Sequence, residues 1–149
     1  MARTAKDVMT ADPACCSPNT PLDEVAKLMA HNNCGEIPII DRSNHPIGVV
    51  TDRDIVCRVV APSKNPATAT AADAMTSPCV TAAEDMSLDE CVRLMEGNRV
   101  RRIAVVNDSG AVSGIVAQAD VALKADAGTV AAVLKRVSQP TRSPSAIGS

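Results

Sequence analysis

GVVTDRD, at Gly48–Asp54, decides the fold, because the chain repeats it as GIVAQAD at Gly114–Asp120, an offset of 66 residues (114 − 48 = 66). In both copies a short apolar run, typical of a strand, leads into a helix start that carries an aspartate. The same offset separates Asp7–Thr10 (DVMT) from Asp73–Thr76 (DAMT), so no gap interrupts the repeat. An internal repeat defines the structural unit. We therefore expect two similar modules whose apolar faces cover each other.

The first copy predicts an ordered set of elements. Thr20 as N-cap and Pro21 at the first helical position begin a helix with one apolar stripe. Short strands follow at 37–40 and 47–50, separated by turn-forming residues, and a second helix opens at Thr51.

The second copy repeats this order, with a capping box at Ser87–Glu90 and strands at 103–106 and 112–116. The proline-containing stretch between the copies predicts a linker. The expected divisions are a first unit at 1–60, a linker at 61–72, a second unit at 73–126, an amphipathic helix at 127–140 and a loose tail at 141–149.

Composition restricts the class of protein. Apolar residues make up 46% of the 149 residues, but Phe, Tyr and Trp are absent, so aliphatic residues, Met and Cys must fill the core. The net charge of −2 argues against a nucleic-acid or anionic-membrane partner. No apolar run approaches the roughly 20 residues that span a bilayer, and no signal-peptide core is present. A cytoplasmic protein is expected.

The six cysteines are expected to be free thiols, because disulfides are uncommon in the cytoplasm. Cys34 and Cys91 take positions that valines hold in the other copy, which indicates small hydrophobes. A metal or redox cluster of Cys15, Cys16, His31 and Cys34 is the alternative. The Cys-x-x-Cys pairs of zinc ribbons are missing, so no metal site is predicted.

The repeated unit resembles the cystathionine β-synthase (CBS) domain, and its duplication resembles a CBS pair, or Bateman module. The resemblance covers roughly Thr4 to Lys124 and rests on the Asp-x-Met-Thr motifs, the Ile-Pro-Ile-Ile run at Ile37 and the repeated stretch at Gly48. It implies an α/β (α+β) fold of tandem CBS domains. Two βαββα units would pack pseudo-symmetrically through their small sheets.

The resemblance also implies a ligand. CBS pairs commonly bind adenine nucleotides (AMP, ADP, ATP, sometimes S-adenosylmethionine) in clefts between the units. In the family's motif, an Asp carboxylate accepts hydrogen bonds from the two ribose hydroxyls, and a Thr hydroxyl and the helix start face the phosphate. The matching residues are Thr51 and Asp54, with Arg53 between them. The second copy keeps Asp120 but has Ala117 in place of the Thr. The alternative is that Thr51 and Asp54 form only a capping box.

Charge distinguishes the two expected sites. Arg101 and Arg102 stand where such pairs place their phosphate-facing residues, and would serve the site of Asp54; a solvated basic edge is the alternative. Glu36 holds the equivalent position in the first copy and would repel phosphate at the Asp120 site. One dominant nucleotide site is therefore expected, with the adenine beside Cys79 and Val80.

Catalysis has little support, because the two histidines lie apart and no phosphate-binding glycine loop is present. The sequence predicts a non-catalytic regulatory module that senses AMP, ADP or ATP, requires no cofactor and acts on an unknown regulated protein. A symmetric homodimer is the default assembly. The alternative function is a ligand-free dimeric interaction scaffold with a redox or stress-response role.

Overall fold

A computed structural model describes residues 3–124 of the chain. The first copy contributes α1 (Ala5–Val8), β1 (Thr10–Ala11), α2 (Leu22–Asn32), β2 (Glu36–Ile40), β3 (Pro46–Thr51), α3 (Asp52–Ile55) and the π-helical turn η1 (Val56–Val60). The second contributes α4 (Ala71–Ala74), β4 (Thr81–Ala83), α5 (Leu88–Asn98), β5 (Arg102–Val106), β6 (Val112–Ala117) and α6 (Gln118–Lys124). The helix predicted at 127–140 and the tail at 141–149 lie outside the described residues.

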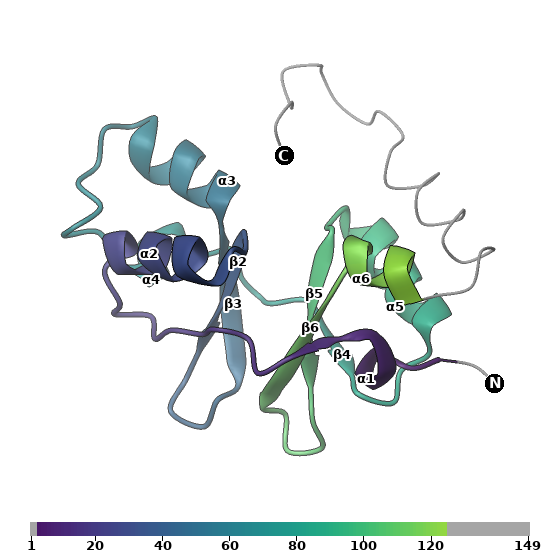
Figure 1. Ribbon diagram of the computed structural model, residues 1–149. Helices are drawn as coiled ribbons and strands as arrows, with labels where there is room; N and C mark the ends of the chain where they lie inside the picture. The colour runs from purple at the N-terminus through teal and green to yellow at the C-terminus, as the bar shows by residue number, and fades with distance from the viewer. Residues whose placement is uncertain (1–2, 125–149) are drawn as a thin grey trace.

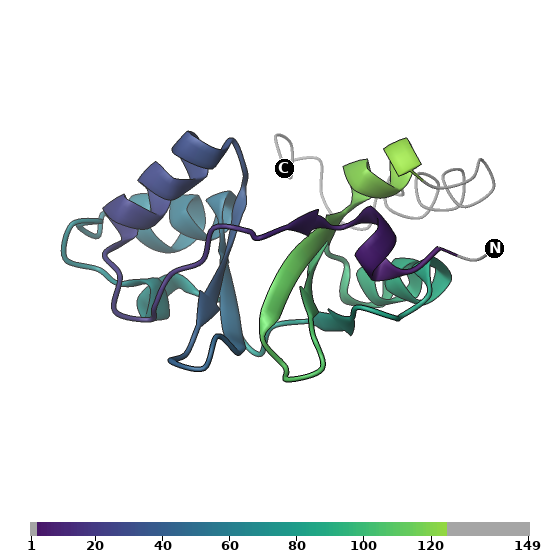
Figure 2. The same ribbon diagram turned by 60° about the horizontal axis from the view of Figure 1, so that its bottom comes forward.

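The strands form two small sheets that lie side by side, with helices on their outer faces (Figures 1 and 2). One sheet is the antiparallel pair β2–β3, and the other has the order β1-β6-β5-β4, with β4 parallel to β5. The predicted mixed α/β fold of two small-sheet units is confirmed. Among the described residues, no helix combines the length and apolar character needed to cross a membrane.

Each unit has its own core, built where the helical stripe meets the strands. In the first, Leu22 and Val25 pack with Ile37 and Ile39. The equivalent cluster of the second unit includes Cys91, which is fully buried, as predicted for a small hydrophobe. The same prediction was wrong for Cys34, whose side chain is exposed.

The two units exchange their first helices. Helix α1 packs into the core of the second unit, where β1 pairs with β6, and Figure 1 shows α1 beside β4. In the same way, α4 packs into the core of the first unit. The segment after α4 bonds to β3 through two backbone hydrogen bonds between Thr76 and Val49, at 2.8 and 3.0 Å. The units are interlocked, and neither core is complete without a segment from the other copy.

Each Asp-x-Met-Thr motif begins inside an exchanged helix, with its aspartate as the third helical residue. The backbone N–H of Thr4 donates to Asp7 at 2.9 Å, and that of Thr70 donates to Asp73 at 2.8 Å, which closes a capping box in each copy. These bonds lower the pKa of both carboxyl groups. The aspartates therefore fix the helix starts that enter the opposite cores.

One predicted helix start is wrong by a residue. Helix α2 begins at Leu22 with Pro21 as its N-cap, because Pro21 has extended backbone angles (φ −59°, ψ 145°). The Thr20 hydroxyl accepts instead from the backbone N–H of Ser17 at 3.2 Å. In α5, the Ser87 hydroxyl caps the N–H of Glu90 at 3.3 Å, as predicted.

Candidate functional site at Asp54

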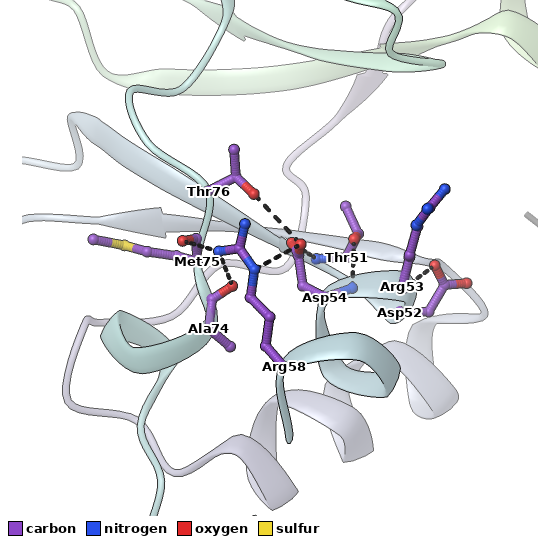
Figure 3. Close-up of polar contacts among 8 residues, drawn as sticks. All are labelled: Thr51, Asp52, Arg53, Asp54, Arg58, Ala74, Met75 and Thr76. Carbon is purple, nitrogen blue, oxygen red and sulfur yellow. Dashed lines mark hydrogen bonds and ion pairs between the residues drawn. The ribbon is translucent and has the colours of Figure 1, made fainter. Parts of the chain in front are cut away.

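Thr51 and Asp54 lie together where β3 passes into α3 (Figure 3). The Asp54 N–H donates to the Thr51 hydroxyl at 3.0 Å, and the Thr51 N–H donates to Asp54 Oδ2 at 2.9 Å. This is a complete capping box, so the alternative that the sequence left open is present in the structure. The box fixes the carboxylate at the start of the helix and uses one of its oxygens.

The other oxygen of Asp54 faces the second copy. Thr76, at the end of the second Asp-x-Met-Thr motif, donates its hydroxyl to Oδ1 at 3.4 Å (Figure 3). Arg58 lies 3.9 Å from the same oxygen and is anchored by hydrogen bonds to the carbonyls of Ala74 and Met75 at 3.1 and 2.9 Å. Only 13% of the Asp54 side chain is exposed. Asp54 is therefore a largely buried carboxylate at which both copies meet.

Sequence reasoning missed Thr76 and Arg58. Arg58 stands four residues after Asp54, a spacing that brings side chains together on a helix, and this signal was available. Thr76 had no local signal, because its proximity depends on the exchange of α4 between the cores. Arg53 was expected in the site, but its side chain is exposed and points away from Asp54 (Figure 3).

Glu36 belongs to the same location, which we call the Asp54 junction: Glu36, Thr51, Asp54, Thr76, Cys79 and Arg102. Glu36 pairs with Thr51 in the register of β2 and β3. From the sequence we expected Glu36 to act at the Asp120 site. The structure places the glutamate opposite Thr51, where the charges of Asp54 and Arg102 act on it. Its role at the Asp120 site stays a prediction.

The Glu36 carboxyl is in an unusual environment. It is 7% exposed, and its Oε2 has no hydrogen-bond partner among the described residues. Burial raises its pKa to about 7; the Arg102 guanidinium opposes this rise and the Asp54 carboxylate adds to it. A Cβ added at Gly35 would lie 2.9 Å from Asp52 Oδ2 and 3.4 Å from an Arg102 nitrogen. Because Asp52 is the first residue of α3, Arg102 reaches the start of that helix.

Cys79 lies in the segment that leads into β4. Burial raises the pKa of its thiol to about 11, with smaller contributions from Glu36 and Cys15. Burial likewise raises the pKa of Cys15 and Cys91 to about 11. These thiols stay protonated at neutral pH and are poor nucleophiles, which weakens a redox role for them. Val80 packs against the second core.

Asp120 repeats half of the Asp54 arrangement. The backbone N–H of Ala117 donates to Asp120 Oδ2 at 2.9 Å, so the acid caps the start of α6 without the threonine. Capping alone accounts for the retention of this acid in the second copy. The carbonyl of Arg101 accepts the Gln118 N–H at 2.9 Å. Within residues 3–124, no group of three or more His, Cys, Asp or Glu is arranged to hold a metal ion.

Comparison with known proteins gives the family. The CBS domain model matches residues 5–61 and 71–125. An uncharacterized protein of Methanopyrus kandleri is 37% identical over 116 residues, which cover 78% of this chain and 57% of that protein, so the chain spans little more than half of that relative. Hypoxic response protein 1 of Mycobacterium tuberculosis is 31% identical over 137 residues, 92% of this chain and 95% of that protein.

Solved structures agree. The crystal structure of Hypoxic Response Protein I, which carries two coordinated zinc ions, has a TM-score of 0.76 at 31% identity and covers 83% of this chain and all of that one. The CBS domain pair of protein MJ0100, in complex with 5′-methylthioadenosine and S-adenosyl-L-methionine, has a TM-score of 0.74 at 27% identity and covers 83% and 95%. Two family-model matches and two interlocked units show that this chain belongs to the CBS domain family, as a tandem pair.

Proposed function

We propose that this chain is a non-catalytic regulatory module that binds an adenosine-containing ligand at the Asp54 junction. The observation that carries the proposal is the largely buried Asp54 carboxylate, which contacts both copies through Thr51 and Thr76. A ligand held there touches both units, so binding changes their relative placement and a regulated protein can detect the change. The adenosine ligands of the MJ0100 pair support this ligand class.

The contacts of Asp54 suggest how a ribose would enter. Oδ2 stays with the Thr51 N–H at 2.9 Å, a strong bond that also holds the helix start. Oδ1 has only the long 3.4 Å contact with the Thr76 hydroxyl and a loose ion pair. Ribose hydroxyls would replace the Thr76 contact at little cost, while the capping box stays intact.

The proposal extends to the rest of the ligand. The adenine would lie beside Cys79 and Val80, whose segment offers apolar contacts and backbone groups. Arg102, which reaches the start of α3, would face the 5′ end of the ligand. AMP, ADP and ATP, which the family resemblance implies, share this adenosine, and the groups around the 5′ end decide how they rank against other adenosine derivatives. The Asp120 position would be the weaker second site.

We also propose that the chain forms a homodimer through η1. Val56 and Val60 lie one helical turn apart and are 56% and 62% exposed, the large hydrophobic side chains that are most accessible among the described residues. A second copy packed on this surface would remove both from water. Such a dimer would contain two Asp54 junctions, one in each copy.

Isothermal titration calorimetry with adenosine, AMP and ATP tests ligand binding, with Asp54→Ala and Asp120→Ala as a matched pair. Both substitutions remove a helix-capping acid, so both cost stability, by about 1 kcal/mol. Only Asp54→Ala is expected to abolish binding. Absence of binding by the wild-type protein, or equal affinities in the two variants, would contradict the proposal.

A further inference from the structure

The start of β2 carries a buried acid that the proposed ribose site does not use. Ile37 and Ile39 are fully buried in the core of the first unit. Because side chains alternate along a strand, Glu36 lies on the opposite face, toward the second unit. Its Oε2 has no hydrogen-bond partner among the described residues. A buried carboxyl oxygen without a partner is costly, and a ligand that supplies a donor or a positive charge relieves that cost.

The position of Glu36 relative to the ribose site identifies the part of the ligand that it meets. Glu36 is the register partner of Thr51, directly before α3, whereas Asp54 stands one turn into that helix. The charges of Asp54 and Arg102 both act on Glu36, and Arg102 reaches Gly35, the residue directly before Glu36. A ribose bound by Asp54 with its 5′ carbon toward the helix start would direct its 5′ substituent at Glu36 and Arg102.

The charges at this point do not favour phosphate. Arg102 already lies beside Asp52 and faces Glu36, so two acids accompany one guanidinium. Arg58 is engaged with Asp54 and two backbone carbonyls, and Arg53 points away. A phosphate here would meet two carboxyl groups beside the Arg102 guanidinium.

We propose, building on the function above, that Glu36 sets the charge that the Asp54 junction accepts on the 5′ substituent. It selects adenosine derivatives with a neutral or cationic 5′ group, such as a thioether or a sulfonium, over those with a phosphate. The carboxylate attracts the cation and repels the phosphate, while the ribose contacts with Asp54 are common to all of these ligands.

This selection depends on pH through Glu36. The groups that face it are Arg102 from β5, Asp54 from α3 and Cys79 ahead of β4; the pKa of Cys79, at about 11, keeps that thiol neutral. The pKa of Glu36 is about 7. A cationic ligand favours the ionised carboxylate, so its affinity rises between pH 6 and pH 8. A phosphate ligand favours the protonated form, and its affinity falls over the same interval.

Calorimetry with four probes tests the inference: adenosine, 5′-methylthioadenosine, S-adenosylmethionine and AMP. Glu36→Gln keeps the shape of the side chain and removes its charge. We expect it to weaken S-adenosylmethionine about tenfold, to strengthen AMP by a similar factor and to leave adenosine within about twofold. Arg102→Gln is the matched control, and it is expected to shift AMP in the opposite direction.

The outcomes separate the two proposals. If Asp54→Ala abolishes adenosine binding but Glu36→Gln shifts all four affinities equally or not at all, the selection by Glu36 is overturned and the ribose site stands. If none of the probes binds the wild-type protein, the proposed function fails and the inference fails with it. The wild-type affinities at pH 6 and pH 8 give a second test that needs no variant: an AMP affinity that does not fall with pH overturns the selection.

Discussion

Gly48→Ala should destabilise the protein because of the way the two copies interlock. A Cβ at Gly48 would lie 2.8 Å from Met75 Sδ and 2.9 Å from the Thr76 carbonyl oxygen. The methionine can move, but the carbonyl is held by the Val49 N–H at 3.0 Å. Relief therefore requires the α4 segment to move away from β3. Overpacking of this kind costs about 2 kcal/mol.

Gly97→Ala is the matched control for this prediction. Nothing lies within 4 Å of a Cβ at Gly97, which is in α5. Alanine is a better helix former than glycine, so this substitution is expected to stabilise by about 0.5–1 kcal/mol. Urea unfolding followed by circular dichroism measures both. A Gly48→Ala variant as stable as Gly97→Ala would refute the account of how Thr76 is held beside Asp54.

Three further predictions concern pH, assembly and thiol chemistry. The pKa of Glu36 is raised from 4.5 to about 7 in the folded state, so its contribution to the free energy of unfolding is fully present below pH 4.5 and is lost as pH rises through 7. The free energy of unfolding of Glu36→Gln should therefore match that of the wild type at pH 4.5 and exceed it by about 3 kcal/mol at pH 8. Urea unfolding at the two pH values measures this difference. A constant difference between the two proteins from pH 4.5 to 8 would argue against the buried acid. Charged substitutions at Val56 and Val60 should convert a dimer to a monomer in light scattering, and an unchanged mass would exclude this surface as the interface. At pH 7.5 a thiol reagent should label the exposed Cys57 in the folded protein. Cys79 is half-buried and its pKa is about 11, so it should react only after unfolding. Mass spectrometry distinguishes the two labelled cysteines, and equal labelling in the folded protein would contradict the environment described for Cys79.

Much of the fold could be predicted because the repeat and the apolar patterns are local. The strands expected at 37–40 and 47–50 lie within β2 and β3, and both helical stripes pack into cores. The exchange of α1 and α4 could not be predicted. An apolar stripe shows that a helix must be covered, and it does not show which of two similar cores covers it.

Only the local part of the candidate site could be predicted. Thr51 and Asp54 are three residues apart on one helix start, so their proximity follows from local geometry. Thr76 reaches Asp54 through the exchanged segment, which the linear sequence does not reveal. Glu36 is the register partner of Thr51 and feels the charge of Asp54, a proximity that comparison at the repeat offset does not reveal.

Hydrogen–deuterium exchange with and without saturating adenosine shows whether one ligand protects both copies. A ligand at the Asp54 junction contacts segments from both copies. We expect slower exchange at 49–55 and, together with it, at 75–81, with little change at 114–121. Protection confined to one copy, or centred on Asp120, would contradict this expectation.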